Sequence, residues 1–148
     1  MIKNIFNPGN YPKNIDFVLL LLRLAVGIFM LTHGIGKFSK LFGGDPIQFA
    51  DPIGVGVTAS LALVVFAEVF CSILLIFGLV TRFAAIPLLI TMLVATFIIH
   101  ANDGFGRQEL PLIYSFVYLI MAIAGAGKIS IDNWITLKLT GSNTNTNT

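Results

Sequence analysis

Long apolar blocks separated by short polar segments dominate the chain. They cover residues 17–38, 53–80, 83–102 and 110–127. Each is close to or above the roughly 20 residues that an α-helix needs to cross the hydrocarbon core of a bilayer. The blocks are too long and too uniformly apolar for barrel strands, which alternate between lipid-facing and interior residues. The pattern therefore predicts an all-α fold, an integral membrane four-helix bundle.

The composition supports a lipid environment. Hydrophobic residues make up 56% of the chain and charged residues 11%, whereas soluble domains carry about 25% charged residues. The lipid bilayer is therefore the first expected partner. A net charge of +2, dispersed along the chain, does not favour nucleic-acid binding.

The single cysteine, Cys71, limits the redox chemistry of the chain. One thiol cannot form an intrachain disulfide, a CxxC pair or a Cys-ligated metal centre within one chain. We therefore expect no metal site, and any redox chemistry would need a bound cofactor.

The chain divides into three parts. Residues 1–16 form a polar N-terminal arm rich in turn residues, and residues 17–132 form the four-span domain. The first block lacks a small-residue cleavage site after it, so we interpret it as a retained anchor. Residues 133–148 combine an interfacial segment around Trp134 with an Asn/Thr tail that we expect to be disordered.

Basic residues predict the orientation. Four spans place both termini and the turn at residues 81–82 on one side of the membrane. That side carries five basic residues, namely Lys3, Lys13, Arg82, Lys128 and Lys138. The other side carries three, namely Lys37, Lys40 and Arg107. The positive-inside rule then predicts a protein of the bacterial cytoplasmic (inner) membrane with both termini in the cytoplasm.

Two charged residues lie inside the apolar blocks, where ionisable groups are costly and often functional. Arg23 lies about 9 Å into the first helix, and Glu68 lies about 18 Å from the same end of the second. Two interpretations stay open. The residues form a structural ion pair, or they bind a ligand; without Arg23, Glu68 would be protonated and could exchange protons near neutral pH.

A second polar group gathers where the first and third helices leave the bilayer. His33 and His100 lie near these helix ends, and Lys37 and Glu109 join them. Each histidine alone is more often satisfied by a backbone carbonyl or by interfacial water. Together the four residues predict a polar mouth. Haem ligation by two histidines would fit this spacing, but it ranks below a quinone-like ligand.

One stripe of the first helix is expected to face the bundle interior. It comprises Arg23, Gly27, Met30, Gly34 and Lys37. Close helix packing explains the two glycines best. On the fourth helix, Tyr114 and Tyr118 share a face, and Tyr114 is a secondary ligand-binding candidate.

These residues resemble the DoxX family of small bacterial four-span membrane proteins over residues 17–132. The likeness lies in Arg23-Leu24, Gly27, His33-Gly34-x-x-Lys37, Glu68, Gly78-Leu79-x-Thr81-Arg82, His100 and Gly125-x-Gly127-Lys128-x-Ser130-x-Asp132. Cys71-Ser72 stands where the family often has a Gly-Gly pair, and the Asn/Thr tail has no counterpart. The family is similar to the membrane subunit of thiosulfate:quinone oxidoreductase, which implies a membrane redox role.

The sequence thus predicts a quinone-interacting subunit of a membrane redox system, served by a partner oxidoreductase subunit or a small reductant. The candidate catalytic residues are Glu68, His33 and His100, and the candidate ligand-binding residues are Arg23, Lys37, Glu109 and Tyr114. The alternative is a non-catalytic membrane scaffold for partner oxidoreductases. A solute carrier is a weaker third interpretation, since one four-helix protomer leaves little room for a lumen.

Overall fold

The computed structural model describes residues 6–141, and within them every regular element is a helix. The elements are α2 (Lys13–Phe42), α3 (Val57–Val65), η1 (Phe66–Cys71), α4 (Ser72–Phe77), α5 (Thr81–Val94), η2 (Ala95–Ile99), α6 (Phe105–Ala124) and α7 (Ile131–Gly141). The two η segments are π-helical turns inside longer helices. The predicted all-α fold is confirmed.

Three of these helices are long and apolar enough to cross a membrane, namely Lys13–Phe42, Val57–Phe77 and Thr81–Ile99. The fourth long helix is α6, which packs along α5 and has 20 residues. That length spans about 30 Å. Arg107 and Glu109 make its first turns polar. Four long helices thus form the expected bundle.

Some element ends differ from the predicted ones. Helix α2 begins at Lys13, inside the predicted polar arm, and α6 begins at Phe105. Pro111 therefore lies in the second turn of α6. Trp134 lies exposed on α7. Lys3 and the Asn/Thr tail lie outside the described residues.

The outer surface of the bundle is apolar. Large side chains are exposed on every long helix, for example Phe29, Phe66, Phe97 and Phe116. The buried cluster between the helices includes Met30, Leu75, Leu88, Tyr118 and Met121. A water-soluble protein rarely exposes so much continuous apolar surface. This surface therefore faces lipid.

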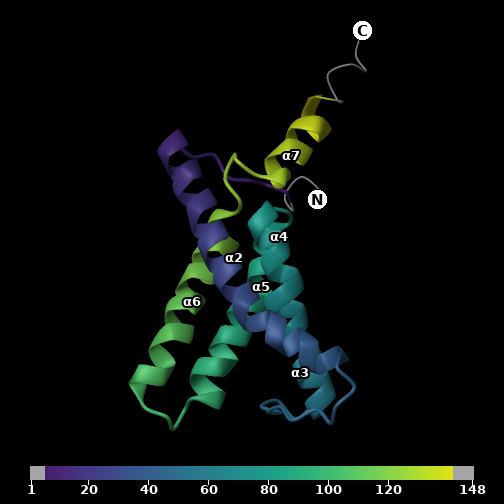
Figure 1. Cartoon of the computed structure of the whole chain (residues 1–148). Coiled ribbons are helices and arrows are strands. Elements are labelled where there is room, and N and C mark those ends of the chain that lie inside the picture. The colour runs from purple at the N-terminus through teal and green to yellow at the C-terminus, as the bar shows by residue number, and fades with distance from the viewer. Residues whose placement is uncertain (1–5, 142–148) are drawn as a thin grey trace.

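Helix α2 crosses the other helices diagonally (Figure 1). Its 30 residues span about 45 Å, which exceeds the hydrocarbon thickness and requires tilt. Two glycines allow close contact at the crossing. A Cβ on Gly34 would lie 2.8 Å from Val69 and 3.0 Å from the backbone of Glu68, and a Cβ on Gly27 would meet Ile76. Their predicted packing role is confirmed.

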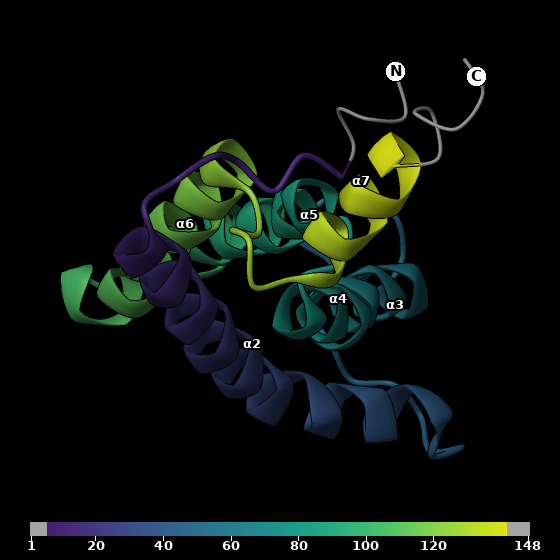
Figure 2. The ribbon, with the colours of Figure 1, turned by 90° about the horizontal axis from the view of Figure 1, so that it is seen from above.

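The two described chain ends and the α4–α5 turn lie at the same end of the bundle (Figures 1 and 2). A segment after α6 joins them, and we call residues 125–132 together with Arg23 the terminal clamp. Arg23 is buried, and its Nη1 and Nη2 atoms donate to the carbonyls of Ala126 and Ile129, each at 2.7 Å. Of the two open interpretations of Arg23 and Glu68, the ion pair is therefore wrong, because the loop carbonyls bind the guanidinium group.

Asp132 connects the clamp to the start of α5. Its carboxylate accepts hydrogen bonds from the backbone N–H groups of Val80, at 2.7 Å, and Thr81, at 3.1 Å. Val80 has φ of 45°, a conformation that costs a β-branched residue energy. Asp132 stabilises this strained turn and satisfies the free N–H groups at the helix start. The N-terminal segment also joins, since the N–H of Gly127 donates to the carbonyl of Pro8.

We predict that Asp132→Asn lowers the free energy of unfolding by about 2 kcal/mol, because a neutral amide replaces a buried carboxylate that accepts two hydrogen bonds. Thermal or denaturant unfolding of the purified protein in detergent measures this loss. Asp45→Asn, at an exposed loop position, is the matched control. Equal stability of both variants would contradict the role of the clamp.

Candidate functional site

The strongest polar interaction inside the bundle joins Lys37 and Glu68. The Nζ atom of Lys37 donates to both carboxylate oxygens of Glu68, at 2.5 and 2.6 Å. The Glu68 side chain is 3% exposed and the Lys37 side chain 32%. A carboxylate at this depth needs a cation beside it. Lys37 provides that cation. The expectation that Glu68 would be protonated if Arg23 did not pair with it therefore does not apply.

The local backbone places Glu68 in the interior. Glu68 lies in η1, a π-helical turn, and the residues on either side of η1 are α-helical. A π-turn holds an extra residue and rotates the following side chains relative to an α-helix, and such turns are frequent at functional sites. Gly34 lets α2 approach this turn closely. Lys37, about one turn further along α2, then reaches the carboxylate.

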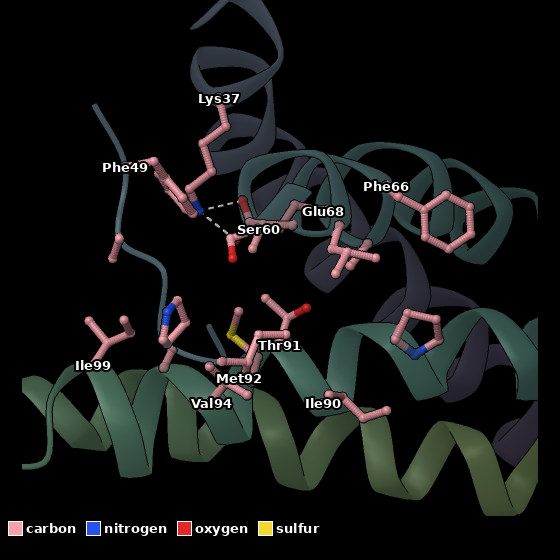
Figure 3. Close-up of a pocket in the computed structure, with 18 of the residues that line it drawn as sticks. Lys37, Phe49, Ser60, Phe66, Glu68, Ile90, Thr91, Met92, Val94 and Ile99 are labelled. Atoms are coloured by element: carbon pink, nitrogen blue, oxygen red, sulfur yellow. Dashed lines mark hydrogen bonds and ion pairs between the residues drawn. The ribbon is translucent and has the colours of Figure 1, made fainter. Parts of the chain in front are cut away.

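A large, mostly apolar cavity lies beside the ion pair. It has a volume of about 500 Å³ and is bounded by α3 and η1 on one side, by α5 and η2 on the other, and by residues 49–53. Figure 3 shows Lys37, Ser60 and Glu68 on one wall and Ile90, Thr91 and Met92 on the opposite wall. Small-molecule sites typically measure about 300–1,000 Å³ and combine apolar walls with a few polar groups. The large cavity fits that description.

A small cavity lies on the other side of the same ion pair. Its volume is about 190 Å³. The residues that line it are Met30, His33, Lys37, Glu68, Met92, Ala95, His100, Leu110, Pro111 and Tyr114. Five of these side chains carry titratable groups. Lys37, Glu68 and His100 line both cavities, so the ion pair and one imidazole form part of the wall between them.

His100 is held by a short network in the loop before α6. Its Nδ1 atom lies 2.8 Å from Oδ2 of Asp103, and Arg107 donates to the same oxygen at 3.4 Å. The hydrogen bond from His100, with the charge of Arg107, lowers the pKa of Asp103 below its usual range. Gln108 donates to the backbone carbonyl of His100 at 2.8 Å. His100 is therefore held through both its imidazole ring and its backbone carbonyl.

Asp51 fixes the loop that covers the large cavity. Its carboxylate accepts hydrogen bonds from the Ser60 hydroxyl at 2.6 Å and from the N–H groups of Gly56 and Val55 at 2.8 and 3.0 Å. The Ser60 hydroxyl, more than any other group, lowers the pKa of Asp51. The next residues, Pro52 and Ile53, line the cavity. Asp51 thus attaches the cavity wall to the start of α3.

The structure brings together five of the seven candidate residues. His33, Lys37, Glu68, His100 and Tyr114 all line the small cavity. Arg23 lies in the terminal clamp and lines neither cavity. Glu109 is exposed near the start of α6 and also lines neither. The predicted ligand-binding positions of Arg23 and Glu109 are therefore not supported by the geometry.

Sequence reasoning missed the apolar part of the site. Thr91 and Met92 on α5, Ser60 on α3 and Phe49 in the preceding loop line the large cavity. Their sequence context is that of ordinary core or loop residues. Only the proline at position 87, inside α5 and on the cavity wall, interrupts a hydrogen bond of the helix and could have marked this region.

Within residues 6–141, no group of three or more His, Cys, Asp or Glu side chains is placed to hold a metal ion. The polar side chains that line the two cavities belong to one ion pair, two imidazoles, a phenol and the hydroxyls of Ser60 and Thr91. Such groups can donate hydrogen bonds to a neutral ligand and exchange protons with it.

Comparison with known proteins identifies relatives over most of the chain. The DoxX family model matches residues 18–101. An uncharacterised protein of Haemophilus influenzae is 33% identical over 136 residues, which cover 84% of this chain and 96% of that protein. No solved structure matches the chain.

Two other relatives carry informative names. "Putative oxidoreductase CatD" of Bacillus subtilis is 28% identical over 125 residues, which cover 83% of this chain and 90% of that protein. "Inner membrane protein YqjF" of Escherichia coli is 28% identical over 127 residues, which cover 83% and 95%.

We predict that Lys37→Met lowers the free energy of unfolding by about 3 kcal/mol, because it leaves the Glu68 carboxylate buried without a cation. The double variant Lys37→Met/Glu68→Met should recover most of that loss, since both charges are removed together. A double-mutant cycle measured by unfolding in detergent gives the coupling. Independent, additive effects of the two substitutions would show that the ion pair contributes nothing.

A second prediction concerns the loop held by Asp51. Because the folded-state pKa of Asp51 is lowered, its hydrogen bonds are present above the unfolded-state pKa of about 4 and are lost as the pH falls through the folded-state value. Asp51→Asn at neutral pH should mimic this loss. We expect severalfold faster amide hydrogen exchange at Val55 and Gly56, with Asp45→Asn as control. Unchanged exchange would show that Asp51 does not hold the loop.

Proposed function

The chain belongs to the DoxX family of membrane proteins, and we propose that it binds a quinone in the large cavity as a subunit of a membrane redox system. The observation that carries this proposal is the position of the Lys37–Glu68 ion pair on the wall of an apolar cavity between lipid-facing helices. A quinone has the matching properties: a flat apolar ring, an isoprenoid or alkyl tail and two carbonyl oxygens.

Lys37 supplies the hydrogen-bond donor that a quinone carbonyl needs. An ammonium group has three N–H donors, and two of them are directed at the two oxygens of Glu68. The third is free to bind a ligand oxygen. A positive charge fixed beside that oxygen stabilises the negative charge that develops on it when electrons arrive.

Glu68 and His100 provide the proton chemistry. Reduction of a quinone to a quinol consumes two electrons and two protons, and both residues line the large cavity. A carboxylate that shares its charge with an ammonium can take up a proton when Lys37 turns toward a ligand oxygen. The electrons would come from a partner oxidoreductase subunit or a small reductant. The printed name of the Bacillus relative supports a redox role.

The proposal includes an orientation in the membrane. The described termini lie at one end of the bundle, and the end of η2 and the loops 43–56 and 100–104 lie at the other (Figure 1). With the basic residues of the terminal end in the cytoplasm of a bacterium, the loops beside the two cavities face the opposite side of the inner membrane. The name of the Escherichia coli relative agrees with that membrane.

Titration of the purified protein with decylubiquinone tests the proposal. We expect saturable binding by the wild type, with micromolar affinity. Thr91→Phe, which fills the large cavity from its wall, should weaken binding at least tenfold. Ile123→Phe enlarges an exposed, lipid-facing residue of α6 and is the matched control, expected to bind within twofold of the wild type.

A second ligand separates specific recognition from partition into detergent. An alkylbenzene with the same tail lacks both carbonyl oxygens and should not compete for the site. Lys37→Met should weaken quinone binding without changing the uptake of the alkylbenzene. Absence of saturable binding by the wild type would overturn the proposal and favour the scaffold alternative.

A further inference from the structure

The small cavity has a composition that quinone binding alone does not explain. Its volume of about 190 Å³ is too small for a tailed ligand, yet it holds five titratable side chains. A space of this size beside titratable side chains accommodates a few water molecules that bond to those side chains. Lys37, Glu68 and His100 line both cavities. Only these shared side chains would therefore separate such water from the large cavity.

The geometry of His100 determines which of its nitrogens can exchange a proton. A carboxylate only accepts hydrogen bonds, so the Nδ1 atom that contacts Asp103 at 2.8 Å carries a hydrogen. In the neutral ring, Nε2 then has a free lone pair. The Asp103 contact thus keeps one tautomer and leaves the other nitrogen available to the cavities.

Charged and titratable groups face His100 from every neighbouring element. From the loop and the start of α6 come Asp103 and Arg107, which form the network on Nδ1. From the other helices come the groups that line the small cavity with it, namely His33 and Lys37 of α2, Glu68 of η1 and Tyr114 of α6. Glu68 is the only one of these that is a buried carboxylate. Glu68 is therefore the residue best placed to accept a proton from His100.

We propose that the small cavity is a water-filled proton entrance, in which His100, oriented by Asp103, passes protons to Glu68. This inference rests on the proposed quinone function and adds its proton route. Nε2 of His100 takes up a proton that comes from a hydronium ion or buffer acid in bulk water, so an N–H bond forms and water or the buffer base is left behind. That bond breaks as an O–H bond forms on Glu68, and the O–H bond breaks in turn as the proton joins the ligand oxygen. Two such transfers accompany the two electrons that a partner reductant supplies.

The two residues have different parts in this route. His100 lines the large cavity and is the residue that moves the proton. Asp103 is a positioning residue, since it acts only through the ring of His100. A purely structural role of Asp103, as a turn residue before α6, would also explain its hydrogen bonds. The experiment must therefore measure proton transfer as well as stability.

Reduction of bound decylubiquinone by reduced methyl viologen, a one-electron donor that carries no proton, measures this route. Stopped-flow absorbance of the viologen gives the rate, after a titration has shown that each variant binds the quinone. We expect His100→Ala to slow the reduction about a hundredfold. Added imidazole should restore part of the rate, and a series of substituted imidazoles should show rates that depend on their basicity.

Asp103→Asn tests the positioning residue. We expect quinone affinity within twofold of the wild type and a reduction rate about tenfold lower. The double variant His100→Ala/Asp103→Asn should be no slower than His100→Ala, because Asp103 acts only through the ring of His100. Asp45→Asn, at the exposed position used above, should leave the rate unchanged.

The outcomes separate the two proposals. Normal quinone binding with wild-type rates in His100→Ala and Asp103→Asn would overturn the proton route and leave the quinone function in place. A slow His100→Ala that no imidazole restores would assign His100 a structural role and also overturn the route. Absence of quinone binding by the wild type would overturn both proposals.

Discussion

A carboxylate buried among lipid-facing helices is stable only next to a positive charge, and the Lys37–Glu68 ion pair meets this requirement. The pair determines how the helices must meet. Lys37 reaches Glu68 because α2 crosses η1 at Gly34, where a side chain larger than hydrogen would contact the opposite backbone. The same crossing leaves the ion pair on the wall between two cavities. Stability and the proposed function thus depend on one contact.

At the other end of the bundle, charged groups satisfy the backbone. Arg23 donates to two loop carbonyls, and Asp132 accepts from two N–H groups at the start of α5. Both side chains are buried, and their partners are backbone groups that no helix satisfies. The charged residues of the family pattern therefore serve two separate purposes. One set stabilises the terminal clamp, and the other set lines the cavities.

The sequence was sufficient to predict the fold and most polar residues of the site. Apolar blocks of about 20 residues identify membrane helices, and titratable residues such as Glu68 and His100 are conspicuous within or beside them. The sequence did not identify Lys37 as the partner of Glu68, because depth along a helix does not define the rotation of a neighbouring helix. Arg23 appeared within reach of Glu68, but the carbonyls after α6 bind it instead.

The apolar part of the site was not predictable, for two physical reasons. The π-helical turns η1 and η2 change the helical periodicity beside Glu68 and His100, and no residue type marks such a turn in a uniformly apolar segment. The loop at residues 49–53 reaches the large cavity only because Asp51 binds the start of α3. Asp51 and the start of α3 come together only in the folded chain, so the sequence does not reveal their contact.

The ion pair is also suited to being opened by a ligand. Lys37 is 32% exposed while Glu68 is 3% exposed, so the ammonium group can turn toward a ligand oxygen at lower cost than the carboxylate can leave the interior. When it turns, the negative charge on Glu68 loses its partner in a low-dielectric environment, where an unpaired charge is costly. In the proposed function, a ligand that accepts a hydrogen bond from Lys37 would thereby weaken the ion pair. The contact that stabilises the fold would then also link ligand binding to proton transfer.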